Sequence, residues 1–273
     1  MSDLMEAKHL PSSLMRQTLL DEELVRPVTD HPVIRMLPWL NVVKVGGHSI
    51  MDKGAAAIRP VVDELLKAMK DHRLVIAAGP GIRGRHVYSV GLDLGLPTGA
   101  LAALAAVDAH KNGTILASLM AEHGVVYLTD DGLSHHLQAF LSAAPAVVGN
   151  GFPPYHLYEF PPEIGRIPPH RADAGAFLLA DAYGAASMVY VEDVDGIFTA
   201  DPATDASATL IPRVGAKELI AMNLPTLPID RVVLELMGPA KHRKEIQVIN
   251  GLVAGNIVKA LNGEHVGTIV YAD

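Results

Sequence analysis

Two glycine-rich turns, the first with a lysine beside it, point most directly to chemistry. Lys44 lies in a short β-branched run, residues 41–45, that ends at the pair Gly46-Gly47. A second apolar run, residues 73–78, ends at Gly79-Pro80-Gly81, and a helical pattern follows. Turns between a strand and a helix N-terminus expose backbone N–H groups that attract phosphate oxygens. The ammonium group of Lys44 could reach the same anion, so the sequence predicts a phosphorylated ligand.

The second turn also resembles two nucleotide-binding motifs, but it matches neither fully. Residues 79–84 have the spacing G-x-G-x-x-G of dinucleotide-binding proteins. That motif requires an acidic residue about 20 positions later, and residues 99–107 contain none. A P-loop would require lysine and Ser/Thr where Arg85 and His86 stand. The prediction of phosphate binding therefore rests on the strand–glycine–helix junctions themselves.

Histidine is the residue type that could bind a metal in this chain. Cysteine is absent, which excludes disulfides, thiolate metal sites and a cysteine nucleophile. Among the 13 histidines, His156 lies in a proline-rich segment, residues 149–171, whose length and composition favour a functional loop. The pair His135-His136 lies near Asp130 and Asp131 at a spacing that matches no known metal motif. A metal site and ordinary surface histidines both remain open for that pair.

The elements that must position these residues follow from an alternation of apolar runs and helical patterns. Beyond the two runs above, strands are expected at residues 125–128, 146–148, 188–191, 246–249 and 268–271. Near-continuous apolar strands that alternate with helices are typical of a mainly parallel sheet covered on both faces. We therefore expect an α/β fold with the glycine turns at the carboxyl edge of the sheet, where ligands bind. Three acidic residues belong to no motif and are expected to be ordinary helix or loop residues: Asp52, Asp108 and Glu192.

Composition separates a short N-terminal arm from the rest of the chain. Residues 1–38 contain several prolines and one expected helix, over residues 12–24, whose leucines require a covering surface. This arm could contact another subunit or lie on the surface, and residues 39–273 are expected to form one domain. The net charge of −8 gives no indication of a nucleic-acid or membrane-surface binder. No apolar run reaches the roughly 18 residues of a membrane span, so a cytoplasmic protein is expected.

Taken in order, several segments resemble the amino-acid kinase superfamily. They are Lys44-x-Gly46-Gly47, the glycine turn after the second strand, residues 172–175 at the start of a helix, residues 194–202, and the closing glycines of residues 250–268. By composition alone, residues 193–202 would predict only a loop rich in turns. Uridylate kinases are similar over about residues 40–271. The molybdenum storage family is more similar still, its alpha chains in particular, at residues 17–19, 37–40, 152–156 and 167–173.

The resemblance implies a three-layer αβα sandwich of the amino-acid kinase fold that binds ATP with Mg²⁺. Lys44, Gly46 and Gly47 would hold the terminal phosphates, and Asp173 would lie near the transferred phosphate as the second catalytic residue. Gly79 and Gly81 lie where kinases hold the acceptor or the transferring group. The adenine and ribose would be surrounded by Asp195, Gly196, Phe198, Thr199 and Asp201. Storage-family chains assemble with a beta-type partner or with copies of themselves into a hexameric cage. The cage uses ATP to load molybdate or tungstate as polynuclear oxide clusters, for which His156 would be a ligand.

Two departures from these patterns leave alternatives open. Uridylate kinases carry lysine immediately before Val-Asp-Gly, where this chain has Asp193. Phosphoryl transfer depends on neutralising charge on the phosphate oxygens, so an anion there argues against ordinary kinase turnover. Leu157 and Tyr158 stand where storage alpha chains are richer in histidine. The alternatives are a uridylate-type nucleoside-monophosphate kinase and a subunit that binds nucleotide but leaves hydrolysis to a related chain.

Overall fold

The computed structural model describes residues 33–159 and 166–273, and it gives no description of the side chain of His156. Most of the expected N-terminal arm, including the helix at residues 12–24, lies outside the described residues. Residues Arg35–Asp273 form one compact unit. Within it Leu37 is buried, and its amide donates to the carbonyl of Tyr183 over 2.8 Å.

Strands and helices alternate along this unit as the sequence predicts. The strands are β1 Leu40–Val45, β2 Arg73–Ala78, β3 Val126–Tyr127, β4 Ala146–Asn150, β5 Ser187–Glu192, β6 Ile197–Phe198, β7 Leu210–Ile211, β8 Arg213–Gly215, β9 Glu245–Asn250 and β10 Thr268–Tyr271. The α-helices are α3 Ala55–Ala68, α4 Gly81–Asp93, α5 Thr98–Met120, α6 Leu137–Ala143, α7 Ala172–Tyr183, α8 Ala216–Met222, α9 Arg231–Met237 and α10 Asn256–Leu261. Short helical turns are η2 Met51–Lys53, η3 Ala121–His123, η4 Gly132–His136 and η5 His156–Tyr158.

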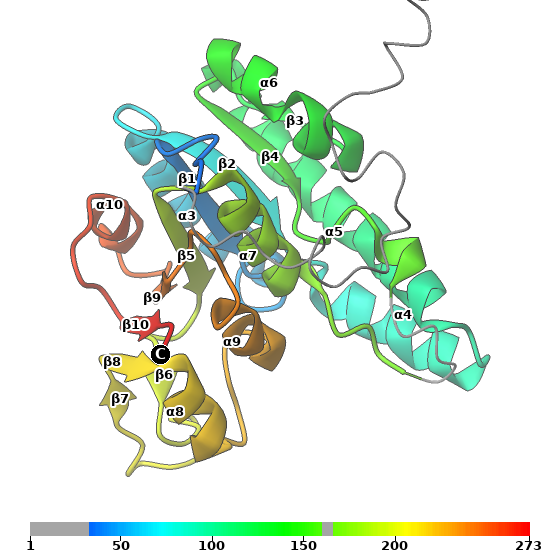
Figure 1. Cartoon of the computed structure of the whole chain (residues 1–273), viewed down its shortest axis with the longest axis vertical. Helices are drawn as coiled ribbons and strands as arrows, with labels where there is room; N and C mark the ends of the chain where they lie inside the picture. Colours follow the sequence, from blue (N-terminus) through cyan, green and yellow to red (C-terminus); the bar gives the residue numbers. More distant parts are fainter. Residues whose placement is uncertain (1–32, 160–165) are drawn as a thin grey trace, which may run out of the picture. The chain divides into compact units, whose positions relative to one another are not determined.

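Eight of these strands form one sheet in the order β3-β4-β2-β1-β5-β9-β10-β8 (Figure 1). Every pair in it is parallel except β9 with β10. Strands β6 and β7 pair separately as an antiparallel hairpin. The predicted mainly parallel sheet is confirmed, and β1 lies at its centre between β2 and β5, so its carboxyl end opens in the middle of the sheet edge.

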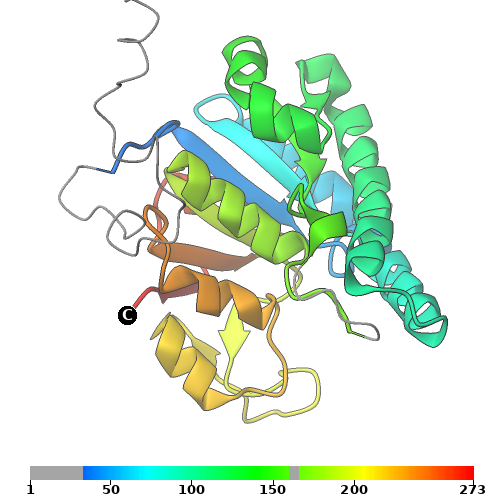
Figure 2. The ribbon, with the colours of Figure 1, turned by 45° about the vertical axis from the view of Figure 1, so that its right-hand side comes forward.

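Helices cover both faces of the sheet, which makes the predicted three-layer sandwich. Val42 belongs to a core cluster with Phe177 of α7, whereas its neighbour Val43 belongs to a second cluster with Leu65 of α3. Adjacent strand residues point to opposite faces, so the two clusters are the two sides of the sheet. Figure 2 shows α7 lying across the central strands on one of these sides. No helix in the described part of the chain is long and apolar enough to cross a membrane.

Candidate functional site

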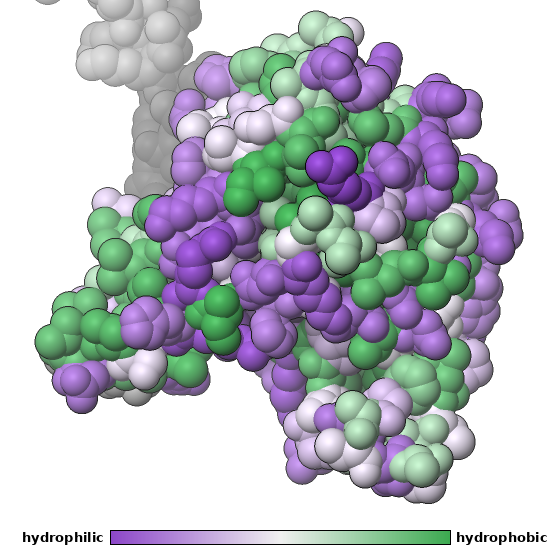
Figure 3. Space-filling view, turned by 180° about the vertical axis from the view of Figure 1, so that it is seen from behind, coloured by the Kyte–Doolittle hydropathy of each residue, from purple (hydrophilic) through white to green (hydrophobic). Residues whose placement is uncertain are grey.

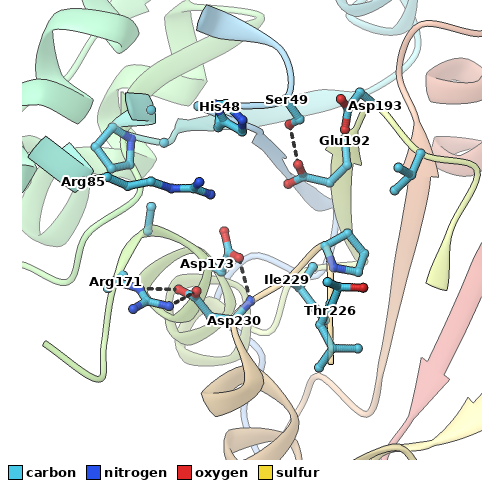
Figure 4. A pocket seen from close by; sticks show the side chains of 18 of the residues that line it. His48, Ser49, Arg85, Arg171, Asp173, Glu192, Asp193, Thr226, Ile229 and Asp230 are labelled. Carbon is cyan, nitrogen blue, oxygen red and sulfur yellow. Dashed lines mark hydrogen bonds and ion pairs between the residues drawn. The ribbon is translucent and has the colours of Figure 1, made fainter. Parts of the chain in front are cut away.

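A cavity of about 1030 Å³ opens at the carboxyl ends of β1, β2 and β5 (Figure 4). The parallel register brings these ends together, since Val45 pairs with both Ala78 of β2 and Val191 of β5. Residues from the two glycine turns, from the start of α7, from the segment after β5 and from residues 226–230 line the cavity. The location agrees with the predicted ligand edge. Of the predicted site residues, the lining contains Lys44, Gly47, Gly79, Gly81, Asp173, Gly196, Phe198 and Asp201.

At the base of the cavity Lys44 lies between two buried carboxylates. Its Nζ is 2.7 Å from Oδ1 of Asp173 and 2.7 Å from Oε1 of Glu192. All three residues are buried, with 6% of Lys44, 7% of Asp173 and 5% of Glu192 exposed. Ser49 donates to the other oxygen of Glu192. The predicted catalytic pair Lys44 and Asp173 is therefore in direct contact, together with a third group that no motif indicated.

The charges of Lys44, Asp173 and Glu192 influence the pKa values of this group of side chains. Burial alone would lower the pKa of Lys44, but the two carboxylates outweigh it and hold that pKa well above its ordinary value. Burial raises the pKa of Glu192, partly offset by Lys44 and reinforced by Asp173. Two carboxylates and one ammonium leave one excess negative charge in a poorly hydrated place. The group is therefore held together by Lys44, and its arrangement will respond to any ligand that competes for that ammonium.

The turn after β1 presents unused hydrogen-bond donors to the cavity. Within the described residues, the amides of Gly47, His48 and Ser49 donate to no protein acceptor, whereas those of Gly46, Ile50 and Met51 do. Successive free amides of this kind make a concave site for an anion. The turn thus retains the donors that the sequence predicted for phosphate oxygens.

The two glycine turns pack backbone against backbone. A Cβ on Gly47 would lie 2.8 Å from the carbonyl carbon of Gly79 and 2.8 Å from Cα of Gly81. Gly81 has φ of +73°, a conformation that favours glycine. Asp52 of η2 fixes the second turn from the other side, because its Oδ2 accepts from the amide of Ile82 at 2.6 Å. Close contact therefore requires glycine at position 47 of the first turn, and conformation favours it at position 81 of the second.

The segment after β5 has two parts that differ in their relation to the cavity. Gly196, Phe198 and Asp201 line it. Asp195 instead accepts from Nδ2 of Asn250 at 2.8 Å, and Thr199 pairs with Thr209 within the β6–β7 hairpin. Both residues hold the segment in place. Gly46 likewise lies outside the lining and accommodates Ser49 and Glu192, because a Cβ there would lie 2.6 Å from Oε2 of Glu192.

Asp193, which stands where uridylate kinases have lysine, is paired with a lysine from another element. Nζ of Lys53 in η2 lies 2.5 Å from Oδ2 of Asp193. Lys53 is part of the same loop that offers the free amides. The charge of Asp193 is thus neutralised in the structure from across the mouth of the cavity.

The opposite wall contains a second ion pair, which is partly buried. Arg171, just before α7, donates through Nε and Nη2 to the carboxylate of Asp230, which precedes α9. Burial and the charge of Asp173 raise the pKa of Asp230, although Arg171 opposes this rise. The amide of Asp230 donates to Oδ2 of Asp173 at 2.8 Å. Asp173 therefore links the Lys44 group to the Arg171–Asp230 wall, and Figure 4 shows its contact with Asp230 beside the Arg171–Asp230 pair.

His156, the predicted metal ligand, lies in the proline-rich segment before α7. The backbone of His156 lies in η5, and its side chain lies outside the described part of the structure. His135 and His136 both lie within 4 Å of Asp131, at 3.1 and 3.8 Å. No group of three or more His, Asp or Glu side chains in the described residues is arranged to hold a metal ion.

Several residues that build the site were not predicted. The expectation that Glu192 and Asp52 are ordinary residues is wrong, since one pairs with Lys44 and the other fixes the second glycine turn. Asp108 is buried on α5 and pairs with Lys111 at 2.9 Å, away from the cavity. Glu192 had one usable signal: it is the acidic last residue of a strand that ends at the ligand edge. The Arg171–Asp230 pair joins residues 59 positions apart and had no such signal.

Comparison with known proteins agrees with this fold. A model of the amino acid kinase family matches residues 39–250, so the chain belongs to the amino acid kinase family. Within the family, uridylate kinases are distant relatives. That of Methanothrix thermoacetophila is 23% identical over 83% of this chain and 97% of its own. The crystal structure of uridylate kinase from Archaeoglobus fulgidus superposes with a TM-score of 0.66 at 22% identity, over 84% of this chain and 99% of that one. This similarity shows the shared fold.

A much more similar relative is a storage protein. The molybdenum storage protein subunit beta of Azotobacter vinelandii is 44% identical over 263 residues, which cover 96% of this chain and 97% of the relative. The predicted resemblance to molybdenum storage proteins is thereby confirmed at the level of the family. This relative is a beta subunit, whereas the short sequence segments indicated the alpha type.

Proposed function

We propose that this chain is a subunit of an ATP-dependent store for molybdate or tungstate, in which the metal is held as polynuclear oxide clusters inside an oligomeric cage. The observation that carries the proposal is the 44% identity to a molybdenum storage subunit along nearly the whole chain. The cavity supports it, because its free amides and Lys44 fit a phosphorylated ligand. Assignment as an alpha-type chain follows from the segments at residues 152–156 and 167–173 and remains a proposal.

The cavity residues fit the nucleotide with its magnesium ion. The amides of Gly47 to Ser49 would receive the terminal phosphate oxygens, and Lys44 would neutralise their charge. Asp193 and Asp201 supply the carboxylate oxygens that a hard divalent cation prefers. Phe198 provides an apolar surface beside them. When bound, ATP with Mg²⁺ would supply the free energy of hydrolysis that drives uptake of the metal oxide.

Lys44 and Asp173 would act as a unit on the terminal phosphate. The ammonium group of Lys44 attracts the phosphate only if its contacts with Asp173 and Glu192 loosen. Binding therefore exchanges protein carboxylates for ligand oxygens around one cation. In this proposal Asp173 directs Lys44 towards the reacting phosphate. Glu192, which accepts a hydrogen bond from Ser49, holds the ammonium group of Lys44 on its other side.

Uridylate-type kinase activity is the second candidate, and Asp193 weighs against it. The relatives with that activity are distant, at 23% to 28% identity over most of the chain. Asp193 places a carboxylate where they have a cation, and Lys53 neutralises it from another element. Release of ADP that depends on UMP, with recovery of the phosphorylated product, would establish the kinase instead.

Metal analysis tests the storage proposal directly. The full-length protein is purified from cells grown with molybdate and incubated with or without ATP and Mg²⁺, and bound metal is counted per subunit by mass spectrometry. We expect several molybdenum atoms per subunit in the presence of ATP–Mg²⁺ and far fewer without it. Only trace molybdenum and tungsten under both conditions would refute the proposal. Unchanged ATP turnover in the assembled Lys44→Ala variant would show that this chain is a scaffold and leaves hydrolysis to a related chain.

Assembly into a cage requires surface that a partner can cover, and α5 offers it. Leu104, Val107, Ile115 and Leu119 recur on one side of this helix and are 43–52% exposed. Figure 3 shows hydrophobic side chains over the lobe where the end of α4 meets the start of α5. Solvent-exposed apolar stripes of this kind mark interaction sites. We propose that this stripe is covered in the assembly, together with contacts from residues 1–38.

Charged substitutions on α5 are therefore expected to dissociate the oligomer. The double variant Leu104→Glu/Ile115→Glu places two charges in the apolar stripe and should lower the mass measured by light scattering during gel filtration. Leu210→Glu on β7, where the leucine is 40% exposed, is the matched control and should keep the wild-type mass. An unchanged mass in the double variant would show that α5 is not part of the interface.

A further inference from the structure

The two halves of the main cavity have opposite electrostatic character. Beside the segment after β5 the lining carries Glu192, Asp193 and Asp201. Across the cavity it carries Arg85 and Arg171 together with two carboxylates that are already paired, Asp230 with Arg171 and Asp173 with Lys44. The acidic half suits a nucleotide whose charge is shielded by a bound cation. The basic half suits an anion that carries no such cation.

Arg85 is the free cation of the basic half. It lies in the second turn of α4, is exposed to the cavity, and makes no ion pair with any described residue. Figure 4 shows its side chain extending from α4 into the cavity, towards Asp173. An arginine held by no carboxylate presents its full set of N–H donors to a ligand. Its position inside the cavity distinguishes it from an ordinary surface arginine.

Tyr88 adds an unused donor on the same face of α4. It follows Arg85 by three positions, so the two side chains lie on one side of the helix. Only 7% of Tyr88 is exposed, and its hydroxyl group has no hydrogen-bond partner among the described residues. Burying a hydroxyl without a partner costs free energy, so such groups usually meet a ligand or a water molecule. Burial also raises the pKa of Tyr88 well above its ordinary value, which keeps the hydroxyl a donor at neutral pH.

Arg171 completes the group from the neighbouring element. Its Nε and Nη2 are used by Asp230, which leaves Nη1 without a partner in the described structure. Arg171 and Tyr88 line the same cavity, and the charge of Arg171 opposes the rise that burial causes in the pKa of Tyr88. Arg85, Tyr88 and Arg171 thus all line the cavity, and each has a donor for which the described structure shows no partner.

We propose that Arg85, Tyr88 and Arg171 form a subsite for a free tetrahedral oxodianion, which in a storage protein is monomeric molybdate or tungstate before its incorporation into clusters. This inference rests on the proposed storage function, because only that function identifies the oxodianion as an oxometalate. Such an anion offers four oxygens that accept hydrogen bonds, for which Arg85 supplies an unpaired guanidinium group and Arg171 its remaining Nη1 donors. The phosphate group of a nucleoside monophosphate shares this chemistry, so the test must separate the two sources.

Titration of the full-length, nucleotide-free protein with sodium molybdate, followed by calorimetry at constant ionic strength, tests the subsite. Arg85→Met should weaken molybdate binding about 10–100-fold, the loss expected for a hydrogen bond to a charged group. Arg59→Met on α3 is the matched control, because Arg59 is exposed and lies outside the cavity lining. The affinity for a fluorescent ATP analogue should stay within about twofold in both variants, since the nucleotide half is untouched.

Tyr88→Phe separates a binding role from a structural one. Removal of a buried hydroxyl that has no partner should leave the free energy of unfolding unchanged or raise it. The same change should weaken molybdate binding about tenfold. A structural role would predict the opposite, with lower stability and unaltered binding.

The outcomes distinguish this subsite from the storage function itself. If the protein retains molybdenum in the metal analysis while Arg85→Met and Tyr88→Phe bind molybdate like the wild type, storage stands and the subsite is refuted. Displacement of molybdate by UMP at lower concentration than by phosphate or tungstate would also refute it, in favour of a nucleotide acceptor site. Molybdate and tungstate that bind more tightly than UMP, with both variants weakened, would support it.

Discussion

Lys44→Met is expected to lower the free energy of unfolding by about 3–5 kcal/mol at neutral pH, the cost of removing one partner from a buried ion pair. The substitution keeps most of the side-chain volume and leaves Asp173 and Glu192 buried without their shared cation. It should also abolish measurable ATP binding, since the ammonium group lines the same cavity as the free amides of the first turn. Chemical denaturation and nucleotide titration measure the two effects separately.

The loss of stability in Lys44→Met should depend on pH in a defined direction. Burial already raises the pKa of Glu192, and Lys44 opposes that rise, so without the lysine the pKa rises further. A carboxyl group whose pKa is raised by folding contributes stability below its unfolded pKa, and this contribution is lost as the pH increases through the folded pKa. The deficit of the variant relative to wild type should therefore be smaller at pH 5 than at pH 8.

Two further variants make this result specific. The double variant Lys44→Met/Glu192→Gln removes one positive and one negative charge from the buried group. It should recover much of the lost stability, and the remaining deficit should depend little on pH. Lys259→Met changes an exposed lysine on α10 and should alter stability by less than about 0.5 kcal/mol. A deficit for Lys44→Met that is equal at both pH values would contradict the proposed charge balance.

Gly47→Ala is expected to destabilise the protein by about 1–3 kcal/mol, the range for overpacking a tightly packed site. The added methyl group would meet backbone atoms of Gly79 and Gly81, which cannot rotate away as a side chain can. Separation of the turns would also displace the free amides of residues 47–49, so ATP affinity should fall with stability. Thermal unfolding and nucleotide titration on one sample record both changes.

Gly238→Ala provides the comparison for Gly47→Ala. Gly238 has ordinary helical φ and ψ of −57° and −59°, and a Cβ there would find its nearest atom at 3.8 Å. Alanine should leave stability unchanged or raise it by up to about 1 kcal/mol, because it restricts the unfolded chain. If Gly47→Ala were as stable as Gly238→Ala, the close contact between the turns would not be essential.

The sheet was largely predictable because each long strand carries its own signal. The runs at residues 73–78 and 268–271 coincide with β2 and β10, and the run at 125–128 shortens to β3 Val126–Tyr127. Strands β6, β7 and β8 were missed because two or three residues are too few to show a period. Their pairing depends on contacts such as that of the Ile197 amide with Thr268 Oγ1, which join distant parts of the chain.

The parts of the candidate site that are formed by consecutive residues were predictable from the sequence. The parts that are formed by ion pairs between residues far apart in the sequence were not. Lys44, the glycine turns and the start of α7 are each recognisable within a few residues. Glu192 and Asp230 carry no such pattern, and they reach the cavity because β5 lies beside β1 and α9 begins beside α7. The fold brings their charges to Lys44 and Arg171, so their roles became visible only in three dimensions.

Asp173 contacts both walls of the cavity at once, through Lys44 on one side and the Asp230 amide on the other. A ligand that draws Lys44 away from this carboxylate changes the charge that Arg171 and Asp230 experience. Linkage then requires that the occupant of the basic half alter nucleotide affinity by the same factor by which nucleotide alters its own. Through this one carboxylate, the anion in the basic half and the nucleotide would change each other's affinity within a single subunit. No movement between subunits would be required.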